Sequence, residues 1–308
     1  MSMPIRTIRT LYLKNETTPG TPETLSGSDA IFAYDIVVKP QHSIIQLPGS
    51  GRYLHVISAI YEGKRWGSFA FKTMVRGTNA APRIGRILKA AGFDETVAAT
   101  SATYTPGLDQ SPLTILAQTD DGHEVQLTYA IVTKCSILGT VGKELVLDVA
   151  GIGMFSNEQF SVTSLTPTFE STDPLILANA TLSSGLQDTY FSELSVNIEN
   201  ADFELSDAAS EYGIAGFYIV GREITGEFNP LVSSSAYYPG FQIADFSITV
   251  GDATQDNQIV ITAPRVEVQE TDIVDDNGVE RYNVAFRCLS TTPSSGNDEI
   301  SIQFNWSS

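Results

Sequence analysis

The side chains that could take part in catalysis are few and lie far apart in this sequence. The three histidines, His42, His55 and His123, have no Cys, His, Asp or Glu neighbour at the spacing of a metal site. Cys135 and Cys288 lie in apolar runs, and Cys135 has no local motif that would activate its thiol. The sequence therefore predicts no catalytic, cofactor-binding or metal-binding residue, no cofactor, and a protein that is not an enzyme.

Acidic clusters are the next candidates for a binding site. They are Asp120-Asp121, Asp298-Glu299 and the run Asp275-Asp276-Asn277-Gly278. The last resembles part of a calcium loop, but the alternating acidic ligands and the distant Glu of such a loop are missing. Asn-Gly between two apolar runs is the strongest short signal for a hairpin turn, which is the better interpretation.

Charge is distributed unevenly along the chain. Residues 1–165 hold 14 Lys+Arg and 14 Asp+Glu, so residues 166–308 hold 4 (18 − 14) and 22 (36 − 14), which carries the whole net charge of −18. The last lysine is Lys143. This balance disfavours nucleic-acid binding, which needs Lys and Arg to displace counterions. The acidic half has two interpretations that stay open, solubility or a specific role.

Hydrophobic patterning predicts a mainly β protein with a single helix. Residues 82–92 place Ile84, Ile87, Leu88 and Ala91 on one helical face, between Pro82 and Gly92 as start and stop signals. Arg83, Arg86 and Lys89 fall on the other face, either as a subunit contact or simply solvated. Strands are expected at 30–38, 53–62, 67–77, 193–205, 216–232, 241–251, 257–274, 280–290 and 299–306, with further strands around a turn at Asp121-Gly122 and before and after a turn at 141–143.

The chain divides into two β-rich parts joined by polar segments. Residues 1–29 read as an N-terminal arm with little structure of its own, and 164–188 as a Pro/Ser/Thr-rich linker. Between and after them we predict β domains at 30–163 and 189–308, in which similar strand and turn orders suggest an internal duplication. Two buried free thiols indicate a reducing compartment, and neither a membrane span nor a secretion signal is visible.

Several segments, in this order, resemble siphophage tail tube (major tail) proteins. They are APRIGRILKAAGFDETV (81–97) followed by ATYTP (102–106), KELVLDVAGIGMF (143–155) and AGFYIVGREITGEFNP (215–230). The resemblance implies two antiparallel β-sandwich or barrel domains of the tail-tube type with one short flanking helix. It also implies a structural virion protein, assembled in the host cytoplasm, whose rings stack into the tail tube through which genome DNA is ejected.

The same resemblance implies partners. They are further copies of the chain, in rings of three two-domain subunits or of six subunits, together with tape measure, tail terminator and distal tail proteins. DNA would pass through without specific binding, and no membrane is involved. The resemblance does not distinguish a contractile from a non-contractile tail. On this view the acidic half repels DNA, and deletion of residues 1–28 should leave a folded subunit that no longer polymerises.

One alternative function from another class stays open. A virion decoration or receptor-binding β-sandwich could use Tyr237, Tyr238, Phe241 and Trp306 as a binding platform, although such aromatic residues more often pack in a core. An enzyme of unrecognised type is a third, poorly supported alternative.

Overall fold

The computed structural model describes residues 9–50, 55–77, 80–119, 122–160, 165–183, 190–232, 239–240, 242–292, 294 and 296–307. Within these ranges, 16 strands form a single antiparallel sheet system that is not closed. A single α-helix, α1 (Gly85–Ala90), and two 3₁₀ turns, η1 (Gly27–Asp29) and η2 (Ala253–Gln255), complete the described secondary structure. The prediction of a mainly β fold with one short helix is confirmed.

Nine of the described strands lie in the first half of the chain and seven in the second. In the first half they are β1 (Arg9–Asn15), β2 (Ala30–Ile31), β3 (Ala33–Ser50), β4 (His55–Met74), β5 (Phe93–Val97), β6 (Ser101–Pro106), β7 (Leu113–Thr119), β8 (His123–Thr140) and β9 (Val146–Phe160). Those that follow are β10 (Thr181–Ser183), β11 (Phe191–Ser206), β12 (Ile214–Pro230), β13 (Gln242–Asp252), β14 (Asn257–Asp276), β15 (Val279–Cys288) and β16 (Ser301–Asn305).

The same strand order occurs twice. In the first half the neighbours in the sheet are β3-β4-β9-β8-β7-β1, and in the second half they are β11-β12-β15-β14-β13-β10. The first run uses β1, β3, β4, β7, β8 and β9, and the second uses β10 to β15. When the strands of each set are numbered along the chain, both runs have the order second, third, sixth, fifth, fourth, first. Strands β2, β5, β6 and β16 lie outside this repeated pattern, and α1 belongs to the insert between β4 and β7.

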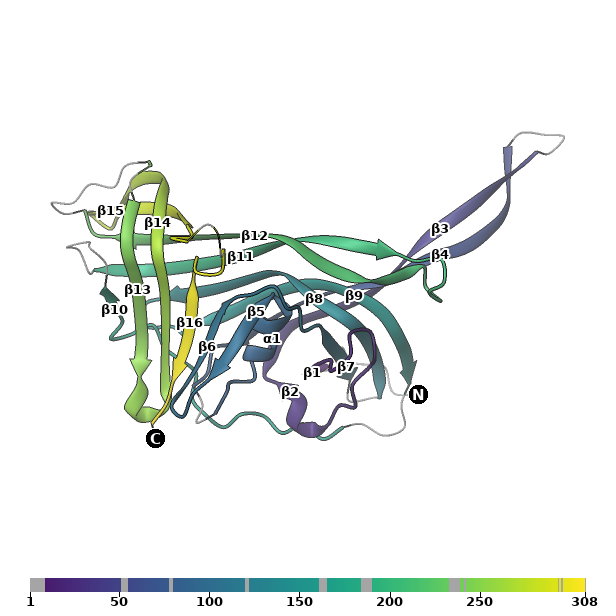
Figure 1. Cartoon of the computed structure of the whole chain (residues 1–308), viewed down its shortest axis with the longest axis horizontal. Helices are drawn as coiled ribbons and strands as arrows, with labels where there is room; N and C mark the ends of the chain where they lie inside the picture. Colours follow the sequence, from purple (N-terminus) through teal and green to yellow (C-terminus); the bar gives the residue numbers. More distant parts are fainter. Residues whose placement is uncertain are drawn as a thin grey trace.

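Two strand pairings join the halves. The C-terminal part of β8 pairs with the N-terminal part of β11, from Lys134 opposite Glu199 to Thr140 opposite Glu193. The last strand, β16, lies between β14 and β6 and so attaches the C-terminus to the first half. In Figure 1 the strands β13, β14 and β16 stand at one end, while the β3–β4 hairpin extends beyond the rest of the molecule at the other.

Alternation of apolar and polar residues explains why one face of this sheet is buried. In β11, Leu194, Val196 and Ile198 are buried, whereas Ser195 and Asn197 between them are partly exposed and the flanking Glu193 and Glu199 are exposed. In β9 and the residue before it, Leu145, Leu147 and Val149 follow the same period. Buried side chains from both halves belong to one continuous cluster, so the core is shared across the β8–β11 seam.

Most sequence-predicted strands and turns are confirmed, with differences in extent in the first half. The predicted strand 30–38 is divided into β2 and β3, and β3 continues to Ser50. Segments 53–62 and 67–77 were predicted as separate strands, but residues 55–74 form the single strand β4. Asn277 and Gly278, with φ of 56° and 87°, form the predicted hairpin turn between β14 and β15. Strands β7 and β8 pair as expected, but Asp120 and Asp121 of their turn lie outside the described residues.

The prediction that residues 1–29 have little structure is wrong for residues 9–15. These residues form β1, which pairs with β7 along its whole length, and Leu11, Tyr12 and Leu13 are buried. Nearby, the Glu16 carboxylate accepts hydrogen bonds from Tyr129 N (2.8 Å) and Gly20 N (2.6 Å). Likewise β10 begins the second repeat inside the predicted linker. The buried residues of β1 do not alternate with exposed ones, and β10 has only three residues, so neither strand shows the period of two that predicts a strand.

The helix is confirmed, with narrower bounds than the predicted 82–92. Ile84, Ile87, Leu88 and Ala91 are buried as expected, and Gly92 adopts the left-handed conformation with φ of 80°. Its basic face is neither a free contact nor merely solvated, because the cations have partners within the chain. Arg86 binds Asp29 Oδ1 (2.9 Å) and Leu13 O (2.5 Å), and Arg83 binds Ala30 O (2.6 Å), so the helix fixes the N-terminal segment.

Replacing Gly85 of α1 by alanine should destabilise the protein, although alanine has the higher helix propensity. An added Cβ would lie 1.9 Å from Tyr104 Oη, and the ring of Tyr104 is fully buried with its hydroxyl donating to Glu95 (2.7 Å). Alanine gains about 1 kcal/mol of helix propensity, but overpacking a fixed ring costs about 1–3 kcal/mol. We expect Gly85→Ala to lower the denaturant midpoint of unfolding. An equal or higher midpoint would show that Tyr104 can move aside.

Candidate functional site

The residues considered for catalysis are dispersed in the structure. His42 is exposed on β3, His55 lies on β4, and His123 at the start of β8 has its Nε2 3.0 Å from Glu158 Oε1. Across the described ranges, no three or more His, Cys, Asp or Glu side chains group in a way that could hold a metal ion. No arrangement of a nucleophile with a base emerges from these positions.

Both cysteines are buried and free, as predicted. Burial raises the pKa of the Cys135 thiol to about 12, and Asp148 acts in the same direction. The Cys288 thiol is raised to about 12 by burial and by Glu299. Because thiolates are the reactive form of cysteine, neither residue is suited to nucleophilic or redox chemistry.

The acidic run at 275–278 is a turn, as predicted. Asp275 Oδ1 accepts a hydrogen bond from Gly278 N (2.6 Å), and Asp276 accepts one from Arg281 Nε (3.0 Å). Asp298 is also held within its loop by the Ser290 and Thr291 hydroxyls, which lower its pKa to about 2. These carboxylates already serve local structure.

The most organised polar feature is the face of the sheet that points away from the core, here called the outward face. Its continuity follows from strand register, because laterally paired residues point to the same side. One row runs through register partners on seven successive strands, β4, β9, β8, β11, β12, β15 and β14: Lys72, Asp148, Ser136, Asn197, Thr225, Arg287 and Glu267. The outward face therefore crosses both halves of the chain without interruption.

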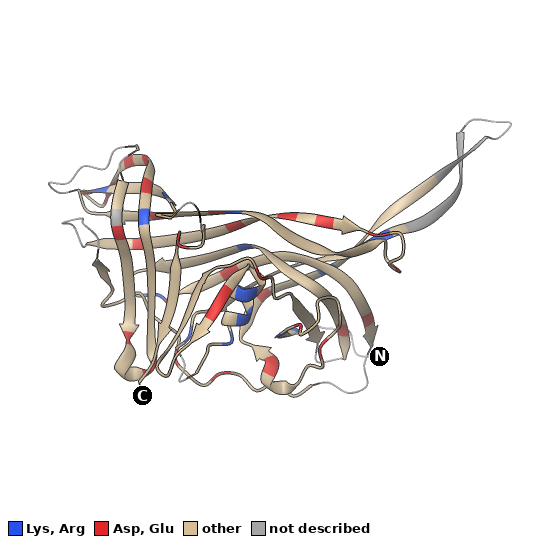
Figure 2. Ribbon diagram, in the orientation of Figure 1, with Lys and Arg blue, Asp and Glu red and all other residues tan. Residues whose placement is uncertain are grey.

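Charge on the outward face follows the division of the chain. The first half contributes the cations Lys39, Lys72 and Lys134 and the acids Asp35 and Asp148 on β3, β4, β8 and β9. From the second half it carries Arg287 together with a set of acids on β11, β12 and β14: Glu193, Glu199, Glu223, Glu227, Glu267, Glu270 and Asp272. Figure 2 shows acidic positions along β11, β12 and β14.

Ion pairs lie on this face without neutralising it. Lys72 Nζ is 3.5 Å from Asp35 Oδ2, Lys134 Nζ is 3.6 Å from Glu199 Oε1 across the β8–β11 seam, and Arg287 pairs with Glu223 between β15 and β12. These side chains are between 39% and 67% exposed, so the pairs contribute little to stability. Glu193, Glu227 and Glu270 have no cation among the ion pairs of the described residues and leave the surface acidic.

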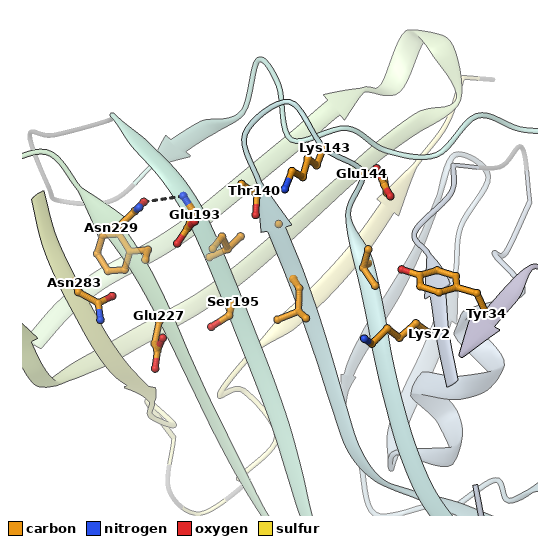
Figure 3. A pocket seen from close by; sticks show the side chains of 15 residues that line it. Tyr34, Lys72, Thr140, Lys143, Glu144, Glu193, Ser195, Glu227, Asn229 and Asn283 are labelled. Atoms are coloured by element: carbon orange, nitrogen blue, oxygen red, sulfur yellow. Dashed lines mark hydrogen bonds between the residues drawn. The ribbon is translucent and has the colours of Figure 1, made fainter. Parts of the chain in front are cut away.

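An open groove of about 470 Å³ lies on the outward face where the two halves meet. Figure 3 shows Lys72 and Tyr34 on its first-half side and Glu193, Glu227 and Asn283 on the other, with Glu193 N donating to Asn229 Oδ1 (2.7 Å). Burial, followed by the nearby Glu144, raises the pKa of the Tyr34 phenol, so it stays protonated. The groove holds dispersed polar groups rather than a reactive cluster.

A family model described as phage tail tube protein matches residues 8–308, which is nearly the whole chain. The chain belongs to the phage tail tube protein family. A search of curated proteins found no match. Family membership makes this tail tube protein a structural component of a bacteriophage tail, which agrees with the resemblance found in its sequence.

Sequence reasoning located the acidic half of this tail tube protein but not which of its acids share a face. Residues 223, 225, 227 and 229 of β12 alternate with the buried Ile224, Gly226 and Phe228. That period was visible in the sequence and assigns Glu223 and Glu227 to one side. The lateral alignment with β11 and β14 was not visible, because it depends on register between strands far apart in the chain.

The aromatic platform of the alternative function receives no support from Trp306. Its side chain is 6% exposed and its Nε1 donates to Ala99 O (3.0 Å), so it packs in the core of the tail tube protein. Tyr237, Tyr238 and Phe241 lie outside the described residues. No helix among the described residues has the length and apolar character needed to cross a membrane.

Proposed function

We propose that this tail tube protein polymerises into stacked rings, and that the outward face of its sheet lines the channel through which genome DNA leaves the virion. The observation that carries this proposal is the accumulation of acids on that face of β11, β12 and β14. The opposite face is committed to the core and cannot line a channel.

Electrostatics supports an acidic channel wall. DNA carries a dense line of phosphates, and proteins that bind it do so by neutralising them with Lys and Arg. A wall dominated by carboxylates offers no such neutralisation and repels the duplex, so DNA slides without adhering. Solubility alone would not require the acids of the second half to collect on the face that continues across both halves.

The repeated strand order supports two tube-type units in each chain. The proposed boundaries at 30–163 and 189–308 would place β1 and β10, which open the two repeats, in the arm and the linker; units beginning at β1 and β10 fit the pairing better. Because each chain holds the unit twice, rings of three chains would present six units. We propose that ring, with the tape measure, terminator and distal tail proteins as partners, and assembly in the host cytoplasm.

Electron microscopy of purified protein tests this function. We expect rings or tubes of uniform diameter, and a reconstruction in which Glu193, Glu227 and Glu267 face the channel. Dispersed monomers at high concentration would contradict polymerisation. Tubes with these three carboxylates on the outside would contradict the assigned channel wall.

Charge reversal on the wall is expected to impede ejection. In virions carrying Glu193→Lys, Glu227→Lys and Glu267→Lys together, the phosphates of passing DNA would meet cations, and we expect DNA release after triggering to slow by about tenfold or more. Release would be followed by the fluorescence of a DNA-binding dye.

A matched triple variant provides the control for charge. Asp109→Lys, Asp173→Lys and Glu211→Lys change the net charge equally at exposed positions away from the outward face. Both variants should yield the same number of tailed particles. Equal release rates in the two variants would show that the wall charge does not influence DNA passage.

A further inference from the structure

The seam between the two halves of the chain is a complete example of unit-to-unit contact. On one edge of β8, β7 pairs with residues 124–130 and β11 pairs with residues 134–140. The opposite edge of β8 is occupied by β9. In the numbering of the repeat, β8 is the fifth strand of the first unit and β11 is the second strand of the second unit. The C-terminal part of the fifth strand of one unit thus pairs with the second strand of the next.

The second unit has the corresponding edge, and no strand of the described ranges covers its far part. Strand β14 occupies the place of β8, β13 pairs with it only as far as Glu267, and Gly240 N donates to Val268 O (2.7 Å) just beyond. Residues 269–276 continue with β15 on their other edge, and no described strand pairs with the side that β13 leaves. This stretch corresponds to residues 134–140 of β8, which hold β11.

The strand that would fill this position is the counterpart of β11, and that strand is β3. It pairs with β4 on one edge, and no strand of the described ranges pairs with the other. Residues 33–39 precede Pro40, which has no N–H to donate, and they match the length of the β11 segment in the internal seam. Within one chain β3 and β14 lie at opposite ends of the run of strands.

Long open edges are unusual, because they invite pairing with other chains. The other edge strands of the described fold are protected by being short: β2 has two residues, β10 has three, and β5 has five, including Asp94 and Glu95. By contrast β3 has 18 residues and β14 has 20. Exposed apolar side chains mark both open edges, with Ile273 at 61%, Val274 at 50% and Val37 at 38%.

Charge also matches across the two edges. In the internal seam, Lys134 on β8 lies opposite Glu199 on β11, with their side chains on the outward face. On the open edges the signs are exchanged. Glu270 and Asp272 lie on the outward face of β14, and Lys39 lies on the same face of β3, whose one acid in residues 33–39, Asp35, is paired with Lys72 (3.5 Å).

From these observations we infer that residues 269–276 of β14 pair antiparallel with residues 33–39 of β3 in a second copy of this chain, in the place that β11 takes on β8. This contact, which rests on the proposed function, makes the outward face continuous from one chain to the next. It is heterologous, since β3 and β14 differ, so it repeats from chain to chain, as a ring requires, instead of forming a two-fold dimer. Pairing of β14 with β14 would oppose acid to acid.

Cross-linking between singly substituted chains tests the seam without requiring knowledge of its register. Lys39→Cys protein is mixed with Glu270→Cys, Asp272→Cys or Val274→Cys protein, allowed to assemble, and treated with a short bis-maleimide. The native thiols are buried and remain unlabelled in folded subunits. We expect covalent dimers in at least one mixture, at several times the yield of any variant alone or of Lys39→Cys mixed with Asp109→Cys.

The outcomes separate this inference from the proposed function. Tubes without cross-links in all three mixtures would overturn the seam and leave the tube intact. Cross-links that form as readily in a single variant would indicate a two-fold contact and also overturn it. Cross-linked chains in a sample without tubes would support the seam and contradict the tube, and the absence of both would contradict both.

Charge exchange supplies a second measurement. Lys39→Glu places an acid opposite Glu270 and Asp272, and we expect the polymerised fraction at a fixed concentration to fall at least tenfold. Adding Glu270→Lys and Asp272→Lys to the same chain should restore most of it. Failure of this rescue, with all variants equally stable in thermal unfolding, would contradict the proposed pairing.

Discussion

Removing residues 1–15 is expected to unfold the protein, not merely to prevent its assembly. These residues contain β1, whose Leu11 and Leu13 are 0% and 1% exposed and belong to the main core cluster. Their loss would expose β7 as well, since β1 pairs with β7 from Arg9 opposite Thr119 to Asn15 opposite Leu113. The sequence-based expectation that deletion of 1–28 leaves a folded subunit is therefore replaced by its opposite.

Point substitutions measure this effect without changing the chain length. Each of Leu11→Ala and Leu13→Ala should reduce the free energy of unfolding by about 2–5 kcal/mol, the usual cost of a buried Leu cavity. Urea denaturation followed by circular dichroism gives the values. Thr10→Ala on the same strand, whose side chain is partly exposed, should change stability by less than about 1 kcal/mol.

Two results would contradict this account of β1. One is a truncated protein lacking residues 1–15 that unfolds cooperatively at the temperature of the full chain. The other is a pair of Leu→Ala variants no less stable than Thr10→Ala. Either result would mean that the fold does not require β1.

Substituting Ile44 and Ile45 is expected to abolish tube formation while leaving the subunit folded. These residues pair with Glu62 and Tyr61 in the β3–β4 hairpin, which projects from the rest of the molecule (Figure 1), and their side chains are 57% and 49% exposed. A two-stranded ribbon without a covering layer is marginally stable in water. Apolar side chains at such a position indicate a surface that another copy covers.

The measurement compares assembly with stability in the same variants. Ile44→Ser together with Ile45→Ser should reduce the polymer recovered by sedimentation at least tenfold, with a change in Tm of less than about 2 °C. The control is His42→Ser with Gln46→Ser, which alters exposed polar residues of the same hairpin and should assemble normally. Normal tubes from the isoleucine variant would show that the hairpin does not bind other copies.

Prediction from sequence succeeded where the signal is local. Alternation predicted β11, β12 and β14 within a few residues, and Asn277-Gly278 predicted the β14–β15 turn, because both patterns reflect burial and backbone conformation at single positions. The helix was found from four buried positions, Ile84, Ile87, Leu88 and Ala91. Buried free cysteines followed from the apolar runs around them.

Prediction failed where structure depends on distant partners. The apolar run Leu11-Tyr12-Leu13 does not alternate, because β1 is buried on both sides, and only its pairing with β7 identifies it as a strand. The basic face of α1 could not be assigned, since Asp29 and Glu170 reach it from distant segments. The outward face could not be predicted either, because its continuity depends on the register of β8 and β11, which are paired across the two halves.

The position of β16 has a consequence for the order of events during synthesis. This five-residue strand follows all the other described strands in the sequence, yet it lies between β14 of the second half and β6 of the first. Translation proceeds from the N-terminus and domains fold as they emerge, so the facing edges of β14 and β6 stay uncovered until residues 301–305 have left the ribosome. The first half of the protein therefore completes its sheet only after the second half has been synthesised.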